Sequence, residues 1–146
     1  MDRPLLDKLV TEVRRYHSKE FLEAAMAVCA LAAVADNEVV RAEHEQVSRV
    51  LAQEPALQIF DAEKAIDLLF ADIYALRSRG EAARQQLYAK VRALSGDHKR
   101  DRTLLRVAYL IILADGEIRD GERKEFANLC RLLGLEPEVV WQEVAG

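Results

Sequence analysis

Two segments of this chain, 79 residues apart, carry the same arrangement of acidic residues. In each segment an Asp is followed by a Glu two positions later and by another Glu seven positions later: Asp36, Glu38 and Glu43, then Asp115, Glu117 and Glu122. Each segment follows an apolar run and precedes a further helical pattern, which is typical of the bend between two helices. The pattern predicts two pseudo-symmetric helix-loop-helix repeats, over about residues 19–53 and 98–133.

The remainder of the chain also has the periodicity of helices. Apolar residues recur at three- and four-residue spacing, and no sustained apolar/polar alternation, the mark of a half-buried strand, is present. We therefore expect an all-α bundle of about seven helices, in which the apolar segment 19–35 is surrounded by other helices. At 146 residues the chain has the size of a single domain, 1–146, with residues 1–17 as a candidate peripheral helix.

Capping and turn residues indicate where several helices begin or end. Ser18 and Asp61 are positioned as N-caps. Gly80 is a predicted break between two helices, Gly134 is a predicted helix stop, and Pro137 is expected near the start of the last helix.

The charge of the chain argues against one class of partner. The net charge of −4 and the dispersed basic residues argue against a nucleic-acid partner, because phosphate backbones are bound by clustered cations. The short basic groups, Lys99, Arg100 and Arg102 and the pair Arg14–Arg15, are interpreted as solvated faces.

The most apolar stretches, 21–35 and 104–114, are shorter than the ~20 residues that a membrane span requires, and the N-terminus has no signal-peptide pattern. We expect a cytoplasmic protein that is not itself membrane-spanning. Cys29 and Cys130 have neither metal-site nor redox spacing and are interpreted as small buried hydrophobes.

The acidic segments suggest a metal site, although neither has the spacing of an EF-hand loop. Two hairpin bends packed about a pseudo-two-fold axis could together supply the six to eight oxygens that calcium takes. Like charges 4 Å apart repel by about 1 kcal/mol in water and about 4 kcal/mol at an effective dielectric constant of 20, so six carboxylates would overcharge one centre. We therefore expect a divalent cation (calcium, magnesium or manganese) to be held by the inner four: Asp36, Glu43, Asp115 and Glu122. Glu38 and Glu117 are expected to face solvent or a second, weaker ion.

Helix capping is the alternative explanation of the same acids. An Asp or Asn suits a helix C-terminus and tight turn, and a Glu in a first turn is favoured by the helix dipole. Capping accounts for acids at each bend but does not require identical spacing twice. On this alternative the protein is a purely structural helical adaptor that binds no metal.

Enzymatic activity has little support in the sequence. The serines have no evident histidine partner, no Gly-rich phosphate loop is present, and His17, His44 and His98 lie in polar contexts typical of surface positions. We expect a non-enzymatic protein without an organic cofactor.

One family shares these features. The chain resembles the TerB tellurite-resistance family from about Ser18 to Trp141, through the segments Lys19–Leu22, Ala27–Ala30, Ala35–Glu38 with Glu43, and Ala114–Glu117 with Glu122. Asn37 stands where the family usually has glycine, and Asn tolerates the left-handed backbone at modest cost.

The resemblance implies a non-enzymatic, cytoplasmic, all-helical protein of bacterial tellurite-resistance and stress-response systems, with a metal-associated acidic surface. It also implies partners, namely a TerC-like integral membrane protein and calcium-binding TerD-like proteins. Through such a partner the protein would lie at the inner face of the membrane.

Overall fold

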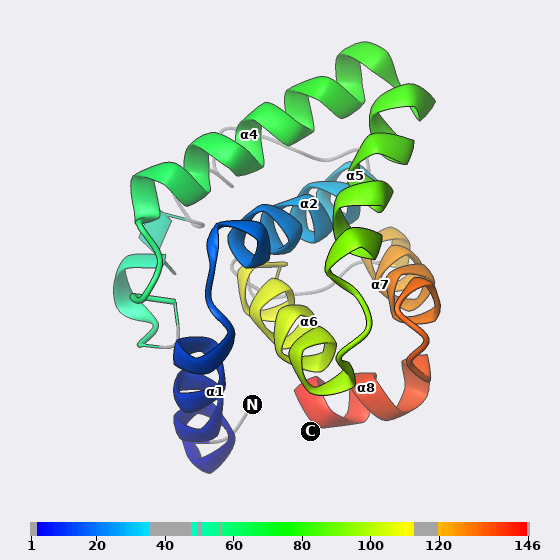
Figure 1. The fold of residues 1–146 in the computed structure, drawn as a ribbon. Coiled ribbons are helices and arrows are strands. Elements are labelled where there is room, and N and C mark those ends of the chain that lie inside the picture. Colours follow the sequence, from blue (N-terminus) through cyan, green and yellow to red (C-terminus); the bar gives the residue numbers. More distant parts are fainter. Residues whose placement is uncertain (1–2, 36–47, 50, 56, 113–119, 146) are drawn as a thin grey trace.

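A computed structural model describes residues 3–35, 48–49, 51–55, 57–112 and 120–145 (Figure 1). Within these ranges the regular structure is helical, without a strand, which confirms the all-α prediction. The helices with both ends described are α1 (Arg3–Tyr16), α2 (Lys19–Ala35), α4 (Ala62–Arg79), α5 (Glu81–Leu94), α6 (His98–Ile112), α7 (Asp120–Leu132) and α8 (Pro137–Ala145). Residues 48–49 and 51–53 are helical as well.

Helix α2 is the centre of the molecule. It packs against α4, α5, α6 and α7, which surround it in Figure 1. From Phe21 to Ala32 every residue of α2 except Glu23 is buried. The prediction that this helix is surrounded is therefore confirmed. Its many alanines leave room for four neighbouring helices to approach closely.

The first and last helices cover the lower side of the bundle in Figure 1. Helix α1 packs against α6 and buries Leu9 and Val13, while α8 packs against α7 and α6. Trp141 of α8 makes edge contacts with Tyr109 of α6 and Phe126 of α7, with ring centroids 5.9 and 5.8 Å away. Aromatic burial thus fixes α8 to its two neighbours.

The predicted helix ends agree with the structure. The Ser18 hydroxyl accepts a hydrogen bond from the Phe21 amide at 3.0 Å, and Asp61 Oδ1 accepts one from the Lys64 amide at 3.2 Å. Gly80 separates α4 from α5 with φ of 57°, Gly134 follows α7 with φ of 73°, and Pro137 begins α8.

The two predicted repeats meet along α2 and α6, which pack against each other. The Cys29 thiol, in α2, donates to the Ala108 carbonyl oxygen, in α6, at 3.9 Å. These positions are 79 residues apart, the spacing of the acidic segments. Equivalent positions of a duplicated unit touch each other where a pseudo-two-fold axis passes between them. The repeat as a whole stays a prediction, because residues 36–47 and 113–119 lie outside the described residues.

No helix within the described ranges combines the length and the apolar character that a membrane span requires.

Candidate functional site

Five of the six predicted metal-site carboxylates lie outside the residues that the structure describes: Asp36, Glu38, Glu43, Asp115 and Glu117. His44 lies outside them too. Glu122 is the sixth, and it belongs to the first turn of α7.

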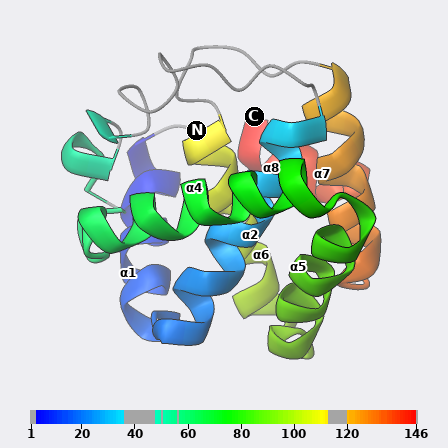
Figure 2. The ribbon, with the colours of Figure 1, turned by 90° about the horizontal axis from the view of Figure 1, so that it is seen from above.

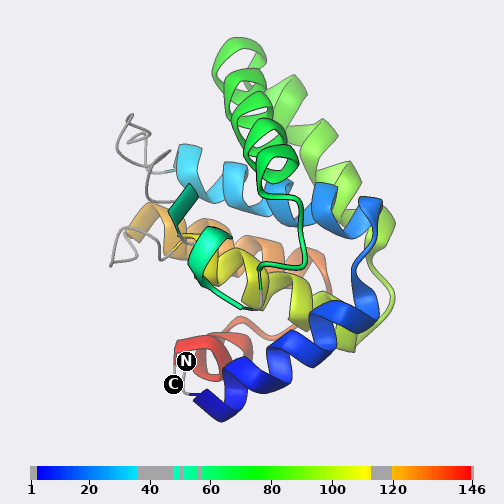
Figure 3. The ribbon, with the colours of Figure 1, turned by 90° about the vertical axis from the view of Figure 1, so that its left-hand side faces the viewer.

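The described helices that flank the acidic segments end near one another. Seen from above in Figure 2, the C-terminal ends of α2 and α6 and the N-terminal end of α7 lie along the same edge of the bundle. The side view in Figure 3 again brings these three ends together. Direct packing of α2 on α6 and on α7 accounts for this arrangement. We call this side of the molecule the helix-end edge.

Glu122 is buried at this edge, with 7% of its surface exposed. The N-terminal end of a helix carries partial positive charge, which stabilises a carboxylate in the first turn. Burial of a carboxylate nevertheless costs free energy unless cations or hydrogen-bond donors offset it. Glu122 is therefore compatible both with a helix-stabilising role and with a place in a metal site.

A second buried carboxylate, that of Glu125, lies one turn further along α7. It is 3% exposed and accepts hydrogen bonds from Arg84 Nη2 at 3.1 Å, from Asn128 Nδ2 at 3.4 Å and from the Tyr88 hydroxyl. Burial, together with the hydrogen bond to Glu125, raises the pKa of the Tyr88 phenol to about 12. These donors satisfy the Glu125 carboxylate, so its role is to attach α7 to α5.

Sequence reasoning did not single out Glu125. Its neighbours Arg84 and Tyr88 are one turn apart on α5, but nothing in their local pattern indicates a partner on α7. The cluster exists only because α5 and α7 both pack against α2. It holds the helix that bears Glu122 in a fixed position beside the helix-end edge.

Burial also shifts the pKa of titratable groups outside this cluster. Burial raises the pKa of Asp72, on α4, and Lys90 at 3.9 Å partly offsets this effect. Burial also raises the pKa of the Cys29 thiol, and it raises that of Cys130 to about 12. Both cysteines are free and buried, which confirms their interpretation as small hydrophobes. Such thiols carry little of the thiolate that a nucleophile needs.

Across the described ranges, no group of three or more His, Cys, Asp or Glu side chains is arranged to hold a metal ion. The predicted site of Asp36, Glu43, Asp115 and Glu122 has only Glu122 among these ranges and stays a prediction.

Comparison with models of protein families gives a match. A family model described as "Tellurite resistance protein TerB" matches residues 22–142, from the first turn of α2 into α8. The matched segment includes both acidic segments and Glu122. Comparisons with curated proteins and with solved structures gave no match.

Proposed function

The chain belongs to the TerB tellurite-resistance family, and from this membership we propose that it is a non-enzymatic, metal-associated interaction protein of a bacterial tellurite-resistance and stress-response system. Its paired acidic bends bind one divalent cation (calcium, magnesium or manganese) through Asp36, Glu43, Asp115 and Glu122. Glu38 and Glu117 face solvent or a second, weaker ion. The ion-loaded surface is the one presented to partners.

The helix-end edge carries this proposal. The first acidic bend follows α2 in the sequence, and the second connects α6 to α7. Because the described ends of these three helices lie along one edge, the two acidic segments join the bundle at neighbouring points of that edge (Figure 2). Hard cations bind several carboxylate and carbonyl oxygens at once, and two adjacent bends can supply them.

Family membership supports a further part of this proposal, which concerns partners and location. A TerC-like membrane protein and TerD-like proteins would bind the acidic surface, and the chain would act in the cytoplasm at the inner face of the membrane. A bound cation neutralises part of that surface, so partner binding should depend on the ion.

A structural adaptor without metal is the second candidate, and one observation favours it. Acids also occupy the first turn of helices outside the two predicted acidic repeats, namely Glu63 in α4, Glu81 in α5 and Glu138 in α8. First-turn acids are thus common in this chain, and Glu122 fits the same pattern. Dipole stabilisation would explain it without any ion.

Titration of chelator-treated protein with calcium, magnesium and manganese separates the two candidates. The metal proposal predicts measurable heat for at least one ion by calorimetry and a concentration-dependent rise in Tm. At a free ion concentration of 100 times Kd the native state gains about 2.7 kcal/mol. The double variant Glu43→Gln/Glu122→Gln should lose this response. Its metal-free form should be at least as stable as the metal-free wild type, because like-charge repulsion is relieved.

The matched control is Glu63→Gln/Glu138→Gln, which removes two first-turn carboxylates that are not part of the acidic repeat and has the same net charge. It should keep the full ion response. Absence of heat and of any Tm shift for wild-type protein at millimolar ion would rule out the metal proposal and leave the adaptor.

A further inference from the structure

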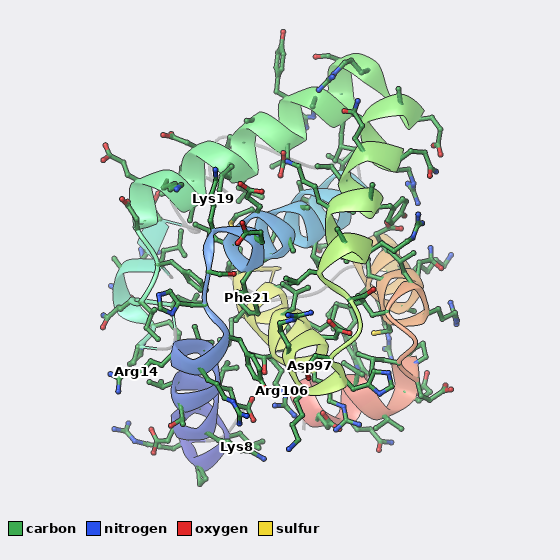
Figure 4. The ribbon with its side chains drawn as sticks, in the orientation of Figure 1. Lys8, Arg14, Lys19, Phe21, Asp97 and Arg106 are labelled. Atoms are coloured by element: carbon green, nitrogen blue, oxygen red, sulfur yellow. The ribbon has the colours of Figure 1, made fainter. Side chains whose placement is uncertain are left out.

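A cavity of about 300 Å³ lies between α1 and α6, near the start of α6. Most side chains that line it are cationic: Lys8, Arg15, Lys99, Arg102 and Arg106. Figure 4 shows Lys8 and Arg106 on the facing sides of the two helices. We call this feature the basic cavity. It is separate from the helix-end edge, which lies at the other end of α6 (Figures 2 and 3).

Helical spacing on two separate segments builds the cavity. Lys8, Glu12 and Arg15 share one face of α1, and Lys99, Arg102 and Arg106 share one face of α6. Packing of α1 on α6 brings these two faces together. The Arg102 side chain is 42% exposed, as expected for a solvated face, but its guanidinium Nε is buried and the residue lines the cavity.

Two carboxylates neutralise only part of this charge. Arg106 lies between Glu12 and Glu143, with Nη1 to Glu12 Oε2 at 2.9 Å and Nη2 to Glu143 Oε2 at 2.8 Å. Arg102 Nη1 is 3.9 Å from Glu143 Oε1. This network holds both arginines in place and pairs Glu12 and Glu143 with them.

The remaining cations have no anionic partner in the described part of the chain. Lys8, Arg15 and Lys99 form no ion pair there, although the Arg15 guanidinium lies over the Tyr16 ring at 5.4 Å. The buried Arg102 Nε has no hydrogen-bond acceptor among the same residues. The whole chain has a net charge of −4, yet positive charge is in excess around this cavity. The Arg102 Nε–H group there is a hydrogen-bond donor without an acceptor among the described residues.

We propose that the basic cavity binds the phosphate group of a small molecule. Its volume is at the lower end of the range for small-molecule pockets, about 300–1,000 Å³. Arginine forks and lysine ammonium groups are the side chains that proteins use to bind phosphate oxygens. The phosphate belongs either to a soluble phosphate ester or to the headgroup of an anionic lipid.

Two neutralising substitutions test the assignment. Lys8→Gln/Lys99→Gln removes one unpaired, exposed cation from each wall of the cavity and leaves the Arg106 network intact. The control Arg14→Gln/Lys124→Gln removes the same charge from exposed residues outside the cavity lining. In Figure 4 Arg14 lies on the far side of α1 from Lys8. Circular dichroism and the urea midpoint of each protein verify that both variants fold.

Calorimetry with inorganic phosphate and with glycerol 3-phosphate forms the first arm. Co-sedimentation with phosphatidylglycerol vesicles, against phosphatidylcholine vesicles, forms the second. Loss of each cation should weaken binding about fivefold, the factor that corresponds to about 1 kcal/mol, so the cavity variant should bind more than about tenfold more weakly. The control should stay within about twofold of wild type.

Binding of the soluble phosphates assigns a free ester as the ligand, and binding to phosphatidylglycerol vesicles alone assigns a lipid headgroup. Two results would overturn the proposal: no binding of wild-type protein to any of these probes, or an equal loss of binding in the cavity variant and in the control.

Discussion

At the scale of single residues, the most informative contact is the one between Tyr88 and Glu125. A buried carboxylate is tolerated because three side chains donate hydrogen bonds to it, and two of these come from α5. Each donor is an ordinary polar residue in the sequence. Their shared acceptor becomes visible only when α5 and α7 are packed together.

Removal of the Tyr88 hydroxyl should destabilise the fold. In Tyr88→Phe the Glu125 carboxylate loses one donor while it stays buried, so the free energy of unfolding should fall by about 1–2 kcal/mol. Urea unfolding at pH 7 measures the difference. Tyr74→Phe is the control, because Tyr74 is 74% exposed, and its effect should be within about 0.5 kcal/mol.

The same variant should also change the alkaline pH dependence. A phenol whose pKa rises from 10.0 to about 12 on folding binds its proton more tightly in the native state. Its contribution to stability is therefore complete below pH 10 and is lost as the pH rises toward 12. Wild-type protein should lose more stability between pH 9 and 11 than Tyr88→Phe does, and equal losses would contradict this assignment.

At the scale of elements, helix ends were predictable because the interactions that end a helix are local. A capping hydroxyl or carboxylate bonds an amide three residues away, as Ser18 and Asp61 do. Gly80 illustrates the same point for a sharp turn. It joins α4 directly to α5, and its amide donates to the Leu76 carbonyl oxygen at 3.0 Å.

Gly80→Ala should therefore destabilise through the backbone alone. A Cβ at this position would meet no atom within 4 Å, but φ of 57° is unfavourable for any residue with a side chain. We expect a loss of at least about 1 kcal/mol in the free energy of unfolding, measured by urea denaturation. Ser78→Ala, at an exposed position of α4, is the control and should change stability little. A neutral Gly80→Ala would show that the α4–α5 turn adjusts its geometry.

At the scale of the whole molecule, α2 organises the fold because small residues let four helices pack around it. Ala30 is fully buried, and the protein interior is packed too densely to accept extra methylene groups without strain. Ala30→Leu should lower the free energy of unfolding by about 1–3 kcal/mol.

Thermal and urea unfolding measure this effect. Ala71→Leu adds the same side chain at an exposed position of α4, so it should leave stability within about 0.5 kcal/mol of wild type. A stable Ala30→Leu protein would mean that the packing around α2 is looser than its burial indicates.

The amino-acid sequence was sufficient for the fold class, for the central position of α2 and for the cap residues Ser18 and Asp61. Each depends on periodicity or on contacts a few residues apart. The acidic repeat was equally visible, and its metal-binding role stays a prediction because Glu122 is the only one of its six acids among the described residues.

Only the tertiary structure shows which charged side chains, distant from one another in the sequence, lie together. Lys8 and Lys99 are separated by most of the chain in sequence, yet they line one cavity because α1 packs on α6. Glu125 likewise acquires its donors from a different helix. Contacts between distant segments depend on how helices pack around a common core. The local sequence pattern of one helix does not predict which charged residues of a neighbouring helix will face it.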